Sequence, residues 1–139
     1  MIPPPWRVLP HGPRFLFVDR LLELEPGTRA VGRKLVTANE ALLTGHFPGN
    51  PIFPGVLLLE ALAQVGGIAW LGSAPAGTGA VLAGVSGARF RRPVLPGDAV
   101  DLEARVIRVL GTTARVQGTA RVEGEEAASA ELTLARGRA

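Results

Sequence analysis

Two ionisable residues, His46 and Glu60, lie in an unusually apolar part of the chain. His46 stands in a loop rich in proline and glycine, and Glu60 interrupts the run Gly55–Val65, whose other residues are apolar apart from Gln64. Placing a carboxylate in such surroundings costs free energy unless it has a partner or a task. An imidazole titrates near neutral pH and can act as a general base, whereas desolvation favours the protonated form of a carboxyl group, which can then act as a general acid. The two residues therefore predict acid–base chemistry.

The composition excludes several other kinds of site. The 139 residues include no cysteine, so disulfides, thiolate catalysis and cysteine-based metal or iron–sulfur sites are excluded. Two histidines leave little for a histidine-based metal site, and we expect no metal and no cofactor. The formal net charge of +3 could attract an acidic partner, but no recognition motif accompanies the arginines, so we expect no nucleic acid.

The sequence shows no sign of export or membrane insertion. Residues 1–7 lack the charged and apolar regions of a secretory signal. The longest apolar run, Gly55–Gly72, is interrupted by Glu60 and Gln64 and is too short for a membrane span. We therefore expect a cytoplasmic protein with no membrane span.

The residues around the pair predict a hairpin followed by a long helix. Phe15–Glu25 and Arg29–Thr37 have the pattern of two strands, joined by a Pro-Gly dipeptide that favours a tight turn. Asn39 can cap a short helical turn over Glu40–Leu43. The main helix should run over Gly55–Leu71 and span roughly 25 Å at about 1.5 Å per residue.

From Ala80 onwards the apolar residues alternate, which is typical of half-buried antiparallel strands. Turns at Pro96–Asp98, Gly111 and Gly124–Glu125 divide this region into four strands. The order of two strands, one long helix and four strands predicts a single α+β domain over residues 1–139. Residues 1–14 form its proline-rich lead-in. A curved antiparallel sheet should wrap around the helix. Because that helix is apolar on more than one face, a second subunit is expected to cover it, which predicts a homodimer.

Three motifs stand out in the sequence: Leu9–Arg20, Gly45–Gln64 and Arg89–Asp98. Together they resemble the bacterial 3-hydroxyacyl-acyl-carrier-protein dehydratases of the FabZ type, which have the hot-dog fold. The resemblance covers nearly the whole chain, and the middle motif is highly specific. The first motif departs from the family pattern at Gly12-Pro13-Arg14, where an aromatic residue is common, so the sequence does not indicate how an acyl channel would be gated.

The resemblance implies a hot-dog fold and reversible dehydration of 3-hydroxyacyl groups to trans-2-enoyl thioesters in fatty-acid biosynthesis. His46 matches the catalytic histidine of the family and Glu60 the catalytic glutamate, which different subunits of a dimer contribute to each site. Related dehydratase/isomerases carry aspartate in place of Glu60, so isomerase activity is not expected. The implied partners are acyl carrier protein with a phosphopantetheine-linked acyl chain and further copies of this chain, as a homodimer or a trimer of such dimers.

Dehydration defines what the site must do. We assign removal of the C2 proton to His46 as general base and protonation of the departing C3 hydroxyl to Glu60 as general acid. The unpaired backbone N–H groups at Gly55 and Val56 can stabilise negative charge on the thioester oxygen, and the missing side chain of Gly55 would let the thioester approach. Gln64 lies four residues after Glu60 on the same helix face and can either orient its carboxyl group or pack as a helix amide.

Other residues are candidates for contact with substrate or carrier. The aromatic candidates for the walls of an acyl channel are Phe47, Phe53 and Phe90. The basic candidates for docking an acidic carrier protein are Arg89, Arg91 and Arg92. A solvated face or structural ion pairs would explain these arginines equally well. His11 is expected to make a local hydrogen bond.

Two other functions fit the same pattern. A hot-dog thioesterase would use the carboxylate to attack the thioester or to activate water. A non-catalytic acyl-binding or assembly subunit would keep the fold alone, although a binder has no need for both His46 and Glu60. The sequence indicates neither the acyl chain length nor the choice between carrier protein and coenzyme A.

Overall fold

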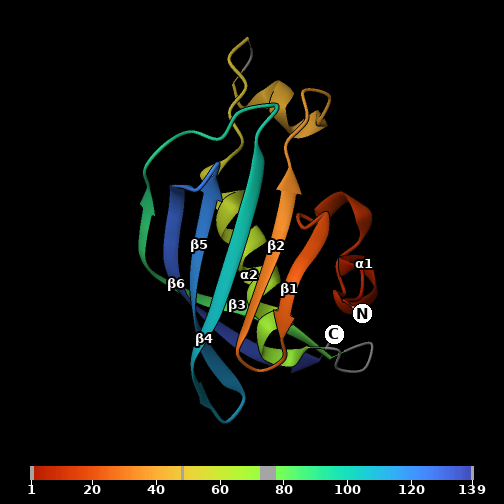
Figure 1. Cartoon of the computed structure of the whole chain (residues 1–139), viewed down its shortest axis with the longest axis vertical. Helices are drawn as coiled ribbons and strands as arrows, with labels where there is room; N and C mark the ends of the chain where they lie inside the picture. The colour runs from red at the N-terminus through yellow and green to blue at the C-terminus, as the bar shows by residue number, and fades with distance from the viewer. Residues whose placement is uncertain (1, 48, 73–77, 139) are drawn as a thin grey trace.

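One long helix, α2 (Gly55–Leu71), lies along a six-stranded antiparallel sheet that curves around it in the computed structural model (Figure 1). The structure describes residues 2–47, 49–72 and 78–138. The strands are β1 (Arg20–Glu25), β2 (Arg29–Leu35), β3 (Thr78–Phe90), β4 (Ala99–Leu110), β5 (Thr113–Val122) and β6 (Glu125–Arg138). Two strands before the helix and four after it confirm the α+β architecture that the sequence predicts.

The strand order in the sheet is β1-β2-β4-β5-β6-β3, and all neighbouring pairs are antiparallel. Buried and more exposed residues alternate along β5, as a strand with one face on the core requires. β3 is 13 residues long and lies at an edge of the sheet. Within the described ranges its outer side pairs with no strand, so it presents a row of free backbone N–H and C=O groups.

The helix lies close to the sheet because a glycine faces it. Leu62 is fully buried above Gly118 of β5, where an added Cβ would be 3.1 Å from the Cβ of Leu62. Leu58 and Val65 are buried on the same helix face. Burial of each of these side chains stabilises the fold by about 1.5–3 kcal/mol. This packing fixes the rotation of α2 about its axis and therefore the direction in which Glu60 points.

The ends of α2 are the ones that the sequence predicts. Pro54 is the N-cap residue and provides no side-chain hydrogen bond, so the first N–H groups of the helix have no side-chain cap. At the other end, Gly72 has φ 58° and its N–H donates to the carbonyl of Ile68 at 2.7 Å. A positive φ favours glycine at this position.

The turn before the loop that carries His46 differs from the prediction in its cap. The 3-10 helix η2 (Ala41–Gly45) has Glu40, not Asn39, at its N-cap position. The side chain of Asn39 instead accepts a hydrogen bond from Oγ1 of Thr37 at 2.7 Å, which turns it away from the helix. Glu40 is anchored by the buried Lys34, whose Nζ lies 2.6 Å from its carboxylate.

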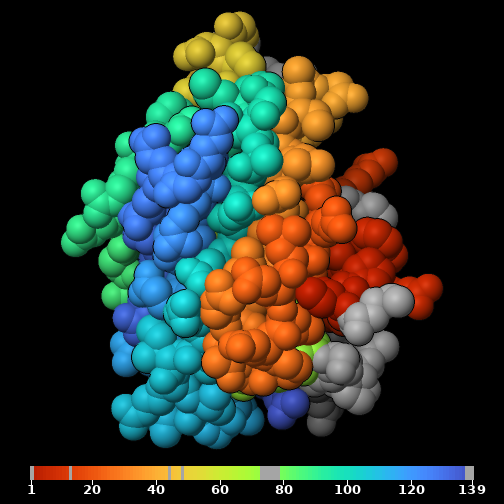
Figure 2. All heavy atoms as spheres, viewed as in Figure 1, coloured from red at the N-terminus to blue at the C-terminus, as the bar shows by residue number. Residues whose placement is uncertain are grey.

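The N-terminal region also differs from the prediction, because the expected strand over Phe15–Glu25 begins only at Arg20. A short helix α1 (Pro5–Val8) and the 3-10 helix η1 (Pro13–Phe15) precede it. The backbone N–H of Phe17 donates to the side chain of Gln64 rather than to a neighbouring strand, whereas that of Asp19 already donates to the carbonyl of Arg33 in β2 at 2.8 Å. Figure 2 shows the outer face of the sheet, with the N-terminal segment packed beside β1.

None of the helices that the structure describes is long and apolar enough to cross a membrane.

Candidate active site

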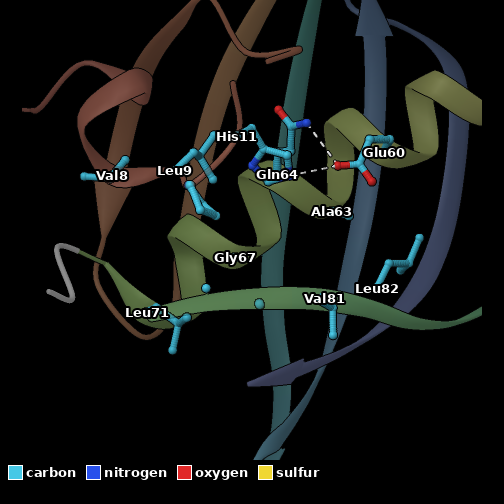
Figure 3. Close-up of a pocket in the computed structure, with 13 residues that line it drawn as sticks. Val8, Leu9, His11, Glu60, Ala63, Gln64, Gly67, Leu71, Val81 and Leu82 are labelled. Carbon is cyan, nitrogen blue, oxygen red and sulfur yellow. Dashed lines mark hydrogen bonds and ion pairs between the residues drawn. The ribbon is translucent and has the colours of Figure 1, made fainter. Parts of the chain in front are cut away.

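A cavity of about 280 Å³ lies between α2, the N-terminal segment and β3 (Figure 3). The helix residues that line it are three or four positions apart and share one face: Glu60, Ala63, Gln64, Gly67 and Leu71. The N-terminal segment contributes Leu9 and His11, and β3 contributes Val81 and Leu82. Glu60, whose side chain is 21% exposed, therefore faces a partly enclosed space that has both apolar and polar walls.

The side-chain amide of Gln64 joins Glu60 to the N-terminal segment. Gln64 is 2% exposed, and its Oε1 accepts a hydrogen bond from the backbone N–H of Phe17 at 2.9 Å. Its Nε2 donates to the carbonyl of Phe15 at 2.8 Å and to Oε2 of Glu60 at 3.0 Å. The spacing of four residues thus brings the amide onto the carboxyl group, as the sequence predicts.

His11 contacts the same carboxylate from the N-terminal wall of the cavity. Its Nε2 lies 3.4 Å from Oε2 of Glu60, and its ring stacks on Phe15 with centroids 6.3 Å apart. The prediction that His11 makes a local hydrogen bond is wrong, because its polar contact belongs to a distant part of the chain. The signal for this residue in the sequence is its place within the Leu9–Arg20 motif.

His46 follows η2, and a backbone carbonyl sets its protonation pattern. Its Nδ1 lies 2.8 Å from the carbonyl oxygen of Ile52, which can only accept, so Nδ1 carries the proton and Nε2 is free in the neutral ring. The backbone N–H of Ile52 donates to the carbonyl of His46 at 2.8 Å and closes the loop. Phe47 stacks on the imidazole with centroids 4.3 Å apart. The loop therefore fixes the orientation of the ring and leaves Nε2 as the nitrogen that can accept a proton.

The start of α2 forms the floor of a second cavity, of about 450 Å³. In this arrangement the ring of Phe90 occupies the space above Gly55 through which the sequence predicts that the thioester approaches the backbone. An added Cβ on Gly55 would be 2.7 Å from Cε1 of Phe90. Val56 beside it is 70% exposed, and Phe90 is 52% exposed. Phe90 therefore covers the helix terminus with a ring that is half exposed to solvent.

The three phenylalanines chosen from the sequence have different environments. Phe53 and Phe90 line the second cavity, but Phe53 is only 1% exposed and belongs mainly to the core. Phe47 is 52% exposed and lines neither cavity.

Two of the three candidate docking arginines have acidic partners within the chain. Nε of Arg91 lies 2.6 Å from Glu126, and Arg92 lies 3.6 Å from Asp98 and 3.5 Å from Glu125. Both arginines line the second cavity. Arg89 is exposed and has no ion pair among the residues described.

The structure brings Glu60, Gln64 and His11 together but leaves His46 apart from them. The cavity at Glu60 and the cavity at the start of α2 share no lining residue. In the part of the chain that the structure describes, no hydrogen bond or ion pair joins His46 to Glu60. One copy of the chain therefore carries His46 and Glu60 in two separate places. The described residues also contain no cluster of three or more side chains suited to a metal ion.

Comparisons with known proteins agree on one family. The FabA-like domain matches residues 9–131. The chain is 52% identical over 133 residues to the 3-hydroxyacyl-[acyl-carrier-protein] dehydratase FabZ of Desulforamulus reducens, covering 94% of this chain and 93% of the relative. It is 53% identical over 130 residues to the protein of the same name from Chloroflexus aggregans, covering 92% and 90%.

Among solved structures, the dehydratase heterocomplex ApeI:P from Xenorhabdus doucetiae is similar, with a TM-score of 0.81. The match covers 99% of this chain and 93% of that one at 16% identity, so it shows the fold alone. The curved sheet around one helix is the hot-dog fold that the sequence predicts.

Replacing Gln64 by leucine should loosen the N-terminal wall of the cavity. The change keeps the side-chain size but leaves the N–H of Phe17 and the carbonyl of Phe15 unpaired, at a cost of roughly 1–3 kcal/mol for each buried group. We expect a lower free energy of unfolding and faster hydrogen exchange at the amide of Phe17. Gln117→Leu on β5 is the control, since its amide makes one part-buried contact of 3.3 Å. Unchanged exchange at Phe17 would contradict the role of Gln64.

Proposed function

The chain belongs to the FabA-like family, and we infer that it is a 3-hydroxyacyl-[acyl-carrier-protein] dehydratase of fatty-acid biosynthesis with His46 as general base and Glu60 as general acid. Relatives that bear this enzyme name are about half identical to it over more than nine-tenths of its length. The observation that carries the two roles is the hydrogen-bond geometry. His46 presents an unprotonated Nε2 in the neutral ring, and Glu60 lies beside a partly enclosed cavity with its Oε2 held by Gln64.

In the proposed reaction, Nε2 of His46 takes a proton from C2 of the substrate. The electron pair of that C–H bond forms the C2–C3 double bond, and the C3–O bond breaks. The protonated carboxyl group of Glu60 gives its proton to the departing hydroxyl, which leaves as water. After the step the imidazole is protonated and Glu60 is a carboxylate, so proton exchange with solvent restores both groups.

Negative charge develops on the thioester oxygen during this step. The N–H groups of Gly55 and Val56 have no side-chain cap and lie at the positive end of the dipole of α2, so we assign the oxyanion site to them. Substrate must then displace the ring of Phe90 from Gly55. Phe90 and the second cavity would form the entrance for the thioester arm.

A second copy of the chain would complete the site. On the edge strand β3, Val81, Leu82 and Val85 are 58%, 38% and 44% exposed, which is unusual for apolar residues beside free backbone groups. Val81 and Leu82 also form one wall of the Glu60 cavity. A partner that adds its own β3 would cover these residues and bring its His46 toward this Glu60. A trimer of such dimers stays a further prediction from the family resemblance.

The substrate partner that we propose is acyl carrier protein with a phosphopantetheine-linked acyl chain, in the cytoplasm. The rim of the second cavity carries the basic side chains that would meet an acidic carrier. Because Arg91 and Arg92 are already paired with carboxylates, the unpaired Arg89 should contribute most of the attraction.

The catalytic assignment predicts the behaviour of two variants. His46→Ala and Glu60→Gln should each lower kcat for dehydration of a 3-hydroxyacyl carrier substrate by roughly 10²–10⁴-fold, because each lacks one proton-transfer group. The formation of enoyl product measures the effect, and thermal unfolding verifies that both variants fold. Glu123→Gln, which changes an exposed turn, is the control.

Full activity in either variant would contradict the assignment. If the wild-type protein releases free thiol from the substrate without forming enoyl product, it is a thioesterase. If it catalyses neither reaction, the alternative of a non-catalytic acyl-binding subunit is supported.

The docking assignment predicts that Arg89→Ala raises KM several-fold for a substrate on carrier protein. The KM for the same acyl group on N-acetylcysteamine should not change, because that thioester has no acidic surface. Arg108→Ala on β4, another exposed arginine, is the control. An equal change for both substrates would show that Arg89 acts on the site itself and not on the carrier.

A further inference from the structure

His11 approaches Glu60 from a part of the chain that is distant in sequence. Its Nε2 lies 3.4 Å from Oε2 of Glu60, and the two side chains are 22% and 21% exposed. This distance is longer than an ordinary N–H···O hydrogen bond of about 2.7–3.2 Å, as is common for catalytic contacts before substrate binds. Figure 3 shows the imidazole and the amide of Gln64 on the same side of the carboxyl group.

The other nitrogen of the ring decides which form of His11 is present. Nδ1 is buried and has no hydrogen-bond partner in the described part of the chain. A proton on Nδ1 would leave a buried N–H donor without an acceptor. A lone pair on Nδ1 that accepts no hydrogen bond costs less free energy. The doubly protonated imidazolium would likewise place an N–H donor at Nδ1, where the described residues offer no acceptor. The surroundings therefore favour the tautomer with its proton on Nε2, which faces Oε2 of Glu60 at 3.4 Å.

The amide of Gln64 has a fixed direction as well. Its Oε1 must be the oxygen, because it accepts from the N–H of Phe17 at 2.9 Å. Its Nε2 is then the donor to Oε2 of Glu60 at 3.0 Å. Oε2 thus accepts a hydrogen bond from Gln64 and also faces Nε2 of His11 at 3.4 Å. An oxygen that faces two N–H groups is a poor place for the acid proton.

The second oxygen of Glu60 has different surroundings. Figure 3 shows Oε1 turned away from both nitrogens. The residues of α2, β3 and the N-terminal segment that line the cavity include no titratable group besides His11 and Glu60. A proton on Oε1 would meet no competing charge from these elements.

We propose that His11 is a positioning residue for Glu60: as a neutral imidazole protonated at Nε2, it holds Oε2 together with Gln64 and leaves Oε1 to deliver the proton. The proposal rests on Glu60 being the general acid of the dehydratase reaction. His11 touches neither the substrate nor the leaving group. It determines which carboxyl oxygen is free and where that oxygen points.

The protonation of His11 can be measured without turnover. The ¹⁵N spectrum of the wild-type imidazoles at neutral pH contains two rings, since the chain has two histidines, and a His46→Asn variant assigns them. We expect the proton of His11 on Nε2 and that of His46 on Nδ1. A His11 ring with its proton on Nδ1, or protonated at both nitrogens, would overturn the proposal.

A matched pair of variants tests the positioning effect. His11→Phe keeps a ring to stack on Phe15 but has no donor, and it should lower kcat by up to about 100-fold with little change in KM, as expected for a displaced catalytic group. His11→Gln can place an N–H near the position of Nε2 and should recover much of that loss.

Equal kcat for the wild type and His11→Phe, or no difference between the Phe and Gln variants, would also overturn the proposal. If His11→Phe does not fold, the ¹⁵N spectrum of the wild type decides alone. Because that spectrum does not depend on turnover, a wild-type protein without dehydratase activity would refute the proposed function and leave the protonation of His11 as a separate result.

Discussion

The orientation of one buried amide sets the geometry of the acid side of the site. Gln64 has a single arrangement that satisfies its neighbours, with oxygen toward Phe17 and nitrogen toward Phe15 and Glu60. Rotating the amide by half a turn would place its nitrogen against the N–H of Phe17 and its oxygen against the carbonyl of Phe15 and the carboxyl group of Glu60. The N-terminal segment is held against α2 through these bonds, and so His11 reaches the carboxyl group. A polar residue in an apolar helix is thus stabilised by the contacts that also direct Glu60.

A separate hydrogen bond orients His46, the proposed base. The carbonyl of Ile52 fixes the proton of His46 on Nδ1, in a loop that ends where α2 begins. His46 lies in the loop before α2 and Glu60 in the second turn of that helix, and of the two only Glu60 lines one of the cavities described above. In the proposed dimer a second copy would join the two residues in one site, and the apolar edge strand β3 is the surface on which that copy would pack. The strongly apolar character of α2 and the incomplete site have a common explanation in the proposed dimer.

Much of the fold could be predicted from the sequence because its signals are local. Pro54 and Gly72 mark the ends of α2, and the alternation of apolar residues gives the four later strands. The parts that could not be predicted depend on contacts between distant residues. Phe15–Val18 does not form a strand because Gln64 takes its backbone groups, and the space above Gly55 is filled by Phe90 from the end of β3. The contact of His11 with Glu60 is of the same kind, since nothing near His11 in the sequence indicates it.

The central claim, that each site takes His46 from one copy and Glu60 from another, can be tested by mixing two inactive proteins. Chains carrying His46→Ala and chains carrying Glu60→Gln are unfolded together and refolded as a mixture, with different tags to show that mixed dimers form. Each mixed dimer would contain one site with both residues intact, so random pairing should restore about a quarter of the wild-type dehydratase activity. No activity in a mixture that contains mixed dimers would contradict the account and place the pair within a single chain.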